Sequence, residues 1–509
     1  MASNDDRDQK IKNIVIVGGG TAGWMTAAAL SHVLSLKKCR IQLIESDQIG
    51  TIGVGEATIP TIHKYNQILG IDENDFIKHT QGTFKLGIQF VNWGGVGSSY
   101  VHPFGGYGMS VGYLGFHHYW QRYHTQNPEA DPGDYSIGVQ GALKYKFMPP
   151  AQIPNSPLAQ ISYAYHFDAT LYAKYLKVFA EERGVERIEG EVVKVSLRES
   201  DGYVDSITLK NGISIQGDLF IDCTGFRALL IEQALNTGYE DWSHWLPCDS
   251  AVTVPSKSMN PPPSFTRSTA HAAGWQWRIP LQHRTGNGHV YCSKYMTDDT
   301  AKKILLDNLE GEALSEPKVV RFKTGMRRKF WNKNCVAIGL SSGFLEPLES
   351  TSIHLIQSSI SKLLAFFPHA SFDQVDIDKY NEILTDEIVN IRDFIILHYK
   401  ITQRTDSEFW NYCRHMEVPI SLQRKIALYK SSGRLFRDNN ELFDDVSWFA
   451  VMHGQGLIFE KYHPLVDEIE DGKFSQLMEE IKAVIARSAD AMPAHNEYIA
   501  KHCAAEAKG

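Results

Sequence analysis

The sequence predicts an α/β fold built on a parallel sheet, followed by a mainly helical C-terminal lobe. Strand and helix signals alternate over residues 1–100 and 155–350 of the 509-residue chain, as they do where helices connect parallel strands. Beyond these residues the hydrophobic periodicity is helical. We therefore expect one domain over residues 1–352, with an insertion near 101–155 that lines a pocket, and a helical lobe over 353–509 that completes the site.

The first readable unit is a strand, a glycine-rich turn and a helix. Ile14–Val17 has the continuous apolar character of a buried parallel strand, and a GxGxxG motif follows it before an Ala-rich helical stretch. Such glycines let the backbone approach a pyrophosphate, and the helix N-terminus offers free N–H groups to the phosphates. A Rossmann-like dinucleotide site is therefore predicted. Its expected contacts in this turn are Gly18, Gly20, Thr21, Ala22 and Gly23.

Later segments indicate which dinucleotide is bound. A second apolar strand ends at Glu45, whose carboxylate can accept hydrogen bonds from both hydroxyls of an unphosphorylated ribose and would repel a 2′-phosphate. A hairpin around Asn211-Gly212, a strand over Leu219–Cys223 and a third strand within NCVAIGLSSGF complete the unit after long insertions. By analogy of fold, this organisation is that of FAD-dependent oxidoreductases of the flavin monooxygenase type. Because no second GxGxxG is present, reducing equivalents are expected to come from elsewhere.

The amino-acid composition limits the partners, the cellular location and the metal sites to be expected. The net charge is -8 and no Lys/Arg stripe is visible, which argues against a nucleic acid or an anionic membrane surface as partner. The start of the sequence is polar and acidic, and no segment approaches the roughly 18 apolar residues of a membrane span, so a cytoplasmic protein is expected. The seven cysteines are scattered without a CxxC pair, which predicts free thiols and no metal site.

The stretch GWQWRIP (Gly274–Pro280) has two interpretations. In an extended segment, residues two apart share one face, so Trp275 and Trp277 would form a single indole wall. The alternative is that they are ordinary core aromatics of a half-buried strand.

Three segments taken together resemble the flavin-dependent tryptophan halogenases. They are GxGxxGW followed by GVGEATIP (Gly53–Pro60), then WQWRIP, and finally GFLEPLESTS (Gly343–Ser352). The resemblance extends from residue 12 to about residue 465. It implies that reduced FAD (FADH2), supplied by a separate NAD(P)H-dependent flavin reductase, reacts with oxygen and a halide ion to form hypohalous acid (HOX). HOX would then pass to Lys85 and halogenate an electron-rich aromatic compound.

The resemblance also assigns site residues. The indole wall keeps organic substrate away from the flavin, backbone amides at Thr351 and Ser352 hold the halide, and His102 and Phe104 face Trp448 across an indole. The wall is Trp275, Trp277, Ile279 and Pro280. Besides the glycine turn, the expected flavin contacts are Glu45, Gly55, Glu56, Ala57, Gly339 and Ser350.

The resemblance specifies the substrate and the halide less directly than the catalytic residues. The Tyr and Glu with which the family grips the amino-acid end of tryptophan have no clear match here, which favours indole or another indole derivative, or a phenol. The family usually has glycine where Ser352 stands, so bromide and chloride both remain open. Ordinary N-capping is the alternative role for Thr351 and Ser352. A homodimer is considered, with the oligomeric state left open.

Two catalytic side chains are expected. Lys85 lies among apolar neighbours, so burial should lower its pKa. A protonated Lys85 would polarise HOX, whereas a neutral Lys85 would form a haloamine. Both mechanisms remain open. Glu349 matches the family's glutamate before Ser-Thr, whereas Glu346, before Pro347, is the alternative with a helix-entry role. The rival function is an FAD-dependent aromatic hydroxylase (monooxygenase). Hydroxylases carry a Gly-Asp pair where this chain has AIGLSSGF and lack WxWxIP.

Overall fold

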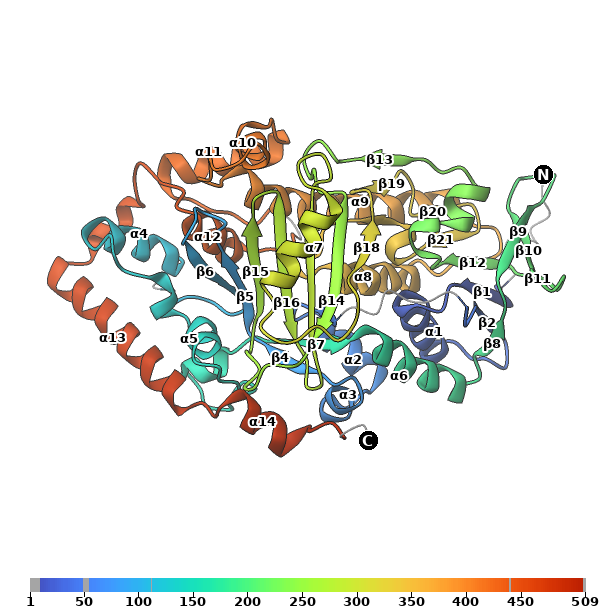
Figure 1. Ribbon diagram of the computed structural model, residues 1–509, viewed down its shortest axis with the longest axis horizontal. Helices are drawn as coiled ribbons and strands as arrows, with labels where there is room; N and C mark the ends of the chain where they lie inside the picture. The colour runs from blue at the N-terminus through green and yellow to red at the C-terminus, as the bar shows by residue number, and fades with distance from the viewer. Residues whose placement is uncertain (1–9, 49–54, 111, 439–440, 507–509) are drawn as a thin grey trace.

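A computed structural model describes residues 10–48, 55–110, 112–438 and 441–506. Gly53 and Val54 of the GVGEATIP segment lie outside these ranges. The chain folds around a six-stranded sheet at one end of the molecule and a seven-stranded sheet at its centre, with helices covering both (Figure 1). This confirms the predicted α/β class.

The six-stranded sheet is the predicted Rossmann-like unit. Its strands lie in the order β20-β21-β12-β1-β2-β8, and all neighbours are parallel except β20 and β21. Strand β1 is central because the chain turns to β2 on one side and later returns to β12 on the other, which leaves a crevice at the strand ends. The bounds are β1 Asn13–Val17, β2 Arg40–Glu45, β8 Glu186–Glu189, β12 Leu219–Asp222, β20 Trp331–Asn332 and β21 Cys335–Ala337.

The seven-stranded sheet carries the tryptophan pair. Its order is β18-β14-β17-β16-β15-β5-β6, and the whole of β16, Gly274–Pro280, is buried. The extended conformation predicted for GWQWRIP is therefore confirmed. The other bounds are β5 Gly87–Val91, β6 Ser99–Pro103, β14 Ser250–Ser256, β15 Thr266–His271, β17 Thr285–Tyr291 and β18 Lys318–Arg321.

Three small sheets complete the strand content. One of them, β3-β7-β4, packs through β3 against β16 and β17 of the seven-stranded sheet and places Lys85 at the end of β4. Its strands are β3 Gly55–Ala57, β4 Thr83–Lys85 and β7 Ala164–Asp168. The second contains β9 Val192–Leu197, β10 Val204–Leu209 and β11 Ser214–Gln216, and the third β13 Tyr239–Asp241, β19 Gly325–Arg327 and β22 Gly343–Phe344. The β10–β11 pair is the hairpin predicted at Asn211-Gly212.

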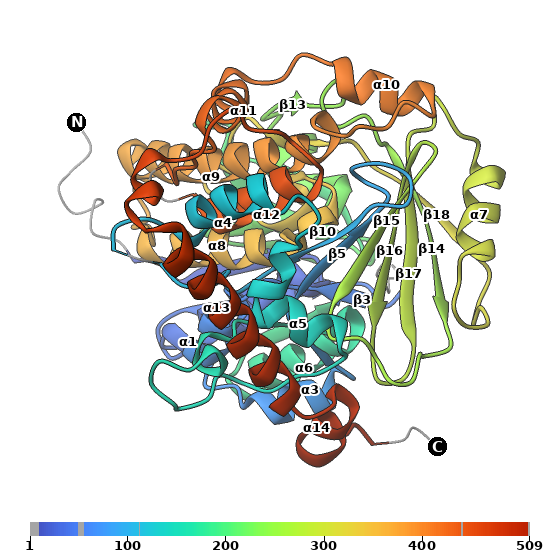
Figure 2. The same ribbon diagram turned by 90° about the vertical axis from the view of Figure 1, so that its left-hand side faces the viewer.

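Helices dominate the C-terminal third, as predicted. They are α8 Ser352–Ala365, α9 Gln374–Lys400, α10 Glu408–His415, α11 Ile420–Ser432, α12 Asp445–Gly454, α13 Asp471–Ala491 and α14 His495–His502. Helix α13 runs diagonally across the face shown in Figure 2. The earlier helices are α1 Thr21–Val33, α2 Ile62–Leu69, α3 Glu73–His79, α4 Phe116–Gln126, α5 Ile137–Leu143, α6 Ala169–Glu182 and α7 Asp298–Asp307. No helix in the described ranges is long and apolar enough to cross a membrane.

The division at residue 352 remains a proposal. Ile353, Ile356 and Ile388, from α8 and α9, line the same cavity as the glycine turn. The helical lobe thus contributes side chains to the cavity that contains the glycine turn.

Candidate active site

A cavity of about 570 Å³ lies at the carboxyl ends of β1, β2 and β12. This volume is within the range of cofactor and ligand pockets. Nearly all of the predicted flavin contacts line it: Gly18, Gly20, Thr21, Ala22, Glu45, Gly55, Glu56, Ala57, Gly339 and Ser350. Gly23 does not line the cavity, because a Cβ there would lie 1.8 Å from Gly18 O. Its role is to let α1 pack closely against the turn.

The glycine turn fits a pyrophosphate. Gly18 has φ +113° and a Cβ there would lie 2.2 Å from Cys223 O, so only glycine is tolerated. Gly20, by contrast, faces open space and precedes α1 without a side-chain cap. The first amides of α1 therefore have no intrahelical partner and point toward the cavity end of β1, as an anion site requires.

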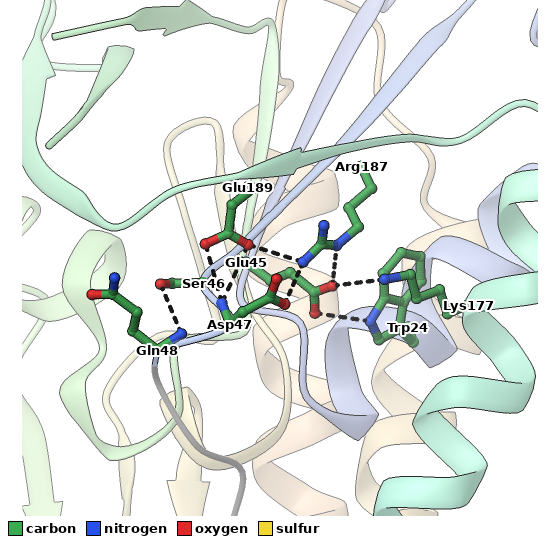
Figure 3. Close-up of polar contacts among 8 residues, drawn as sticks. All are labelled: Trp24, Glu45, Ser46, Asp47, Gln48, Lys177, Arg187 and Glu189. Atoms are coloured by element: carbon green, nitrogen blue, oxygen red, sulfur yellow. Dashed lines mark hydrogen bonds and ion pairs between the residues drawn. The ribbon is translucent and has the colours of Figure 1, made fainter. Parts of the chain in front are cut away.

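Glu45 lies at the predicted ribose end of the cavity, but its carboxylate already has protein partners (Figure 3). Lys177 Nζ lies 3.3 Å from Oε1, Arg187 donates to the same oxygen, and Trp24 Nε1 donates to Oε2 at 3.2 Å. Each carboxylate oxygen can accept more than one hydrogen bond. The contact between Glu45 and the ribose stays a prediction. The Glu45 carboxylate is held in place by the two cations Lys177 and Arg187.

The indole wall faces the cavity. Trp275, Trp277 and Ile279 line it, whereas Pro280 does not and instead accepts a hydrogen bond at its carbonyl from Thr83. Trp277 lies against Gly288, where a Cβ would be 2.1 Å from the indole ring. The two tryptophans are thus both buried core residues and the surface of the cavity, so the two interpretations of the sequence are compatible.

Lys85 is fully buried beyond this cavity. Its Nζ donates to Thr58 O at 3.0 Å and to Ser350 Oγ at 2.8 Å, and it lies 5.0 Å from the centre of the Phe104 ring. Burial lowers the pKa of Lys85 to about 7, although the charge of Glu349 opposes that shift. Ser350 itself lines the cavity. Ser350, a residue of the cavity lining, therefore also contacts the Lys85 amine.

Glu349 is buried between two histidines. His102 Nδ1 lies 3.1 and 3.0 Å from its two carboxylate oxygens, and His398 Nε2 lies 2.8 Å from Oε1, outside good hydrogen-bond alignment. Burial raises the pKa of Glu349, but the charge attraction and hydrogen bonding of His102, with a smaller contribution from His398, outweigh that effect and hold the pKa at about 2. An ionised carboxylate therefore persists in this buried region.

Glu346, the alternative carboxylate, lies in a different environment. It is fully buried and accepts hydrogen bonds from Trp275 Nε1 at 2.8 Å and Tyr399 OH at 2.5 Å. Both donors are neutral, and burial raises the pKa of Glu346 to about 7. Two glutamates three residues apart are thus driven to opposite protonation preferences, the arrangement expected where acid and base roles are separated. Glu346 precedes the short helix Pro347–Glu349, as its helix-entry role predicted, but its side chain does not cap it.

The predicted halide amides lie at the start of α8. Thr351 is the residue before the helix and makes no side-chain cap hydrogen bond, so ordinary N-capping is not its role. The first amides of a helix lack intrahelical acceptors and attract anions. Ser352 lines the cavity, whereas Thr351 is buried without lining it. Ser350 precedes them with φ +59°, a left-handed conformation that is uncommon for a residue with a side chain.

The predicted indole sandwich stays a prediction. His102 is engaged by Glu349, and Phe104 lies beside Lys85, but Trp448 on α12 contacts Phe394 rather than either of them. Phe394 lies 5.7 Å from His102 and stacks on Phe443 at 3.9 Å, measured between ring centres. Phe394 therefore contacts both His102 and Trp448, two residues of the predicted sandwich.

Sequence reasoning missed several of these residues. Thr58, Phe394, His398 and Phe443 touch predicted site residues, and Tyr399 touches the alternative carboxylate, Glu346. The available signal was the pair His398-Tyr399, two polar side chains inside the apolar run FIILHYK of α9. The contribution of Thr58 is a backbone carbonyl, which no residue type could have indicated. Among the described residues no three His, Cys, Asp or Glu side chains converge as a metal site, and all seven cysteines are free.

Comparison with known proteins agrees with this geometry. A sequence profile of the tryptophan halogenase family matches residues 13–471. The tryptophan 6-halogenase ThaL of Streptomyces albogriseolus is 35% identical over 89% of this chain and 90% of its own. The tryptophan 7-halogenase RebH of Lentzea aerocolonigenes is 33% identical over 88% and 90%. Among solved structures, the flavin-dependent halogenase Xcc4156 from Xanthomonas campestris is 47% identical with a TM-score of 0.95, covering 98% of this chain and all of its own. The chain therefore belongs to the tryptophan halogenase family and is a flavin-dependent halogenase, an oxidoreductase.

Proposed function

We propose that this enzyme forms HOX at its flavin cavity and uses it, through Lys85, to halogenate an indole-type aromatic compound. The family implies FAD, and the reaction implies a halide. When bound, reduced FAD with oxygen supplies the oxidising power that turns halide into HOX. The observation that supports the proposal most strongly is that Lys85 Nζ donates to Ser350 Oγ, a hydroxyl of the cavity lining.

Residues of the chain then carry the halogen onward. With a pKa of about 7, Lys85 is available in both forms near neutral pH. As the ammonium it donates a hydrogen bond to HOX and polarises the O–X bond. As the free amine it is halogenated: an N–X bond forms, an N–H and the O–X bond break, and water leaves. Either species presents electrophilic halogen beside Phe104.

Glu349 serves the aromatic step. Attack of the ring on the halogen leaves a cationic intermediate that must lose a proton. A carboxylate that stays ionised can stabilise that cation and accept the proton. The histidines on either side orient Glu349 and keep it charged.

The substrate proposal rests on the aromatic side chains near Lys85 and Glu349. Phe104 lies beside Lys85, and His102, the partner of Glu349, packs on Phe394 and Phe443. Aromatic side chains of this kind pack well on an indole ring. Related enzymes are tryptophan halogenases by name. We propose indole or an indole derivative as substrate, with tryptophan among the compounds to be tested. The reducing equivalents come from a separate flavin reductase, since the chain has no second dinucleotide motif.

Mass spectrometry of the products tests this proposal. The enzyme is incubated with FAD, an NADH-driven flavin reductase, oxygen and either indole or tryptophan, in parallel with bromide and chloride. The proposal predicts products with a halogen isotope pattern, absent in Lys85→Ala. A hydroxylated product would instead support the monooxygenase alternative.

A further inference from the structure

Glu346 is a buried carboxylate that the proposed chemistry does not use. Its Oε2 receives both hydrogen bonds, from Trp275 and Tyr399, while Oε1 has no protein partner among the described residues. A buried carboxylate with an unpaired oxygen is costly. An apolar side chain would fill this space equally well, so packing alone does not explain why a carboxylate is buried here.

Within the described part of the chain, the two side chains that bond Glu346, Trp275 and Tyr399, are not cations. The titratable groups that interact with it are the Tyr399 hydroxyl and the thiols of Cys248, Cys292 and Cys413. Burial raises the pKa of all four, so they are neutral near pH 7. Glu346 is therefore the one group of this cluster that titrates near neutral pH.

Helix α9 connects both glutamates. Its adjacent residues His398 and Tyr399 contact Glu349 and Glu346, respectively. Trp93 packs between them, with ring centres 6.0 Å from His398, 5.4 Å from Tyr399 and 6.4 Å from Trp275. The indole wall of the flavin cavity and the carboxylate of the aromatic site are thus fixed to the same end of one helix.

We infer that Glu346 is a positioning residue of the indole wall: it anchors the Trp275 N–H against Tyr399 and α9, and so fixes the ring of Trp275 on the flavin cavity. Among the described residues, Glu346 is the only hydrogen-bond acceptor of the Trp275 indole N–H. Without the anchor the ring can rotate within the cavity, and oxidising equivalents escape before they reach Lys85. This last consequence rests on the function proposed above; the anchoring of Trp275 does not.

Fluorine NMR tests the anchor without flavin. The protein is labelled with 5-fluorotryptophan, and the Trp275 resonance is identified as the one lost in Trp275→Phe. In the wild-type protein this resonance should shift between pH 6 and pH 8, as the carboxyl loses its proton. In Glu346→Gln, which keeps the shape and an acceptor but cannot titrate, the shift should vanish. Tyr380→Phe is the matched control, because Tyr380 is a buried tyrosine of α9 that bonds Ser359 O instead.

The functional arm uses the complete reaction. The fraction of consumed oxygen that appears as halogenated product should fall about fivefold, the factor of one lost hydrogen bond, in Glu346→Leu, which removes the acceptor of the Trp275 N–H, and in Tyr399→Phe, which removes the other donor to Glu346. It should stay at the wild-type level in Tyr380→Phe. A Trp275 resonance that titrates equally in Glu346→Gln would overturn the inference. The inference would also be overturned if the fraction of oxygen converted into halogenated product were unchanged in both variants of the functional experiment. Failure of the wild-type enzyme to halogenate would refute the proposed function alone, since the NMR result would still decide whether Glu346 anchors Trp275.

Discussion

Replacing Lys85 by methionine should change the stability of the fold by an amount that depends on pH. Methionine fills a similar volume without an ammonium group. The fall in the pKa of Lys85 from its ordinary 10.5 to about 7 corresponds to about 5 kcal/mol, because one pKa unit is worth about 1.4 kcal/mol. This is the free energy by which burial disfavours protonated Lys85.

The sign follows from proton binding. Between pH 7 and 10.5 the unfolded chain holds the Lys85 proton and the folded chain has released it. Wild-type stability therefore rises with pH across this window, and is lower below it. The methionine variant has no such dependence. The stability of Lys85→Met relative to the wild type should therefore fall by about 2.5 kcal/mol between pH 7.5 and pH 9.5, close to the linkage limit of about 1.4 kcal/mol per pH unit.

Urea unfolding followed by tryptophan fluorescence measures this difference at each pH. Methionine also leaves Thr58 O and Ser350 Oγ without their partner, which adds a constant penalty of about 1–3 kcal/mol each but no pH dependence. Lys64→Met, at an exposed position of α2, is the control. A difference between wild type and Lys85→Met that stays constant from pH 7.5 to 9.5 would refute the lowered pKa of Lys85.

Three further predictions concern the same region. Glu349→Gln should lower halogenation about 100-fold or more at unchanged affinity for oxidised FAD, and wild-type rates would remove Glu349 from the aromatic step. Because the pKa of Glu349 is held at about 2, its contribution to stability is present above pH 4.5 and lost toward pH 2; an acid titration of unfolding in which Glu349→Gln parallels the wild type would contradict this. Gly19→Ala should weaken FAD binding in a flavin fluorescence titration, since its Cβ would lie 1.7 Å from Glu45 Oε2, whereas Gly95→Ala, which meets nothing within 4 Å, should bind normally.

The parts of the fold that the sequence predicted are those with strong local signals. The apolar run Ile14–Val17 and the glycine turn gave β1 and the start of α1, and the i, i+2 pair of tryptophans gave the extended β16. Gly184, with φ +96°, ends α6 as expected. In each case the local backbone conformation requires a particular kind of residue, and that residue can be recognised in the sequence.

The parts that were not predicted depend on contacts distant in sequence. Nothing in the local sequence around Glu45 indicated that Lys177 and Arg187 would engage its carboxylate. The opposite environments of Glu346 and Glu349 arise because α9 returns with Tyr399 and His398. Motif position selected Glu349, but only the three-dimensional partners show why the two glutamates differ.

The central proposal is that halogen reaches the substrate through Lys85. Single-turnover reactions with bromide, indole and a soluble 1,3-diketone that traps HOX test it directly. The wild-type enzyme should yield mostly bromoindole, and Lys85→Met should yield brominated trap in similar total amount, with little bromoindole. If Lys85→Met forms bromoindole as the wild type does, with the trap unbrominated, transfer through Lys85 is contradicted.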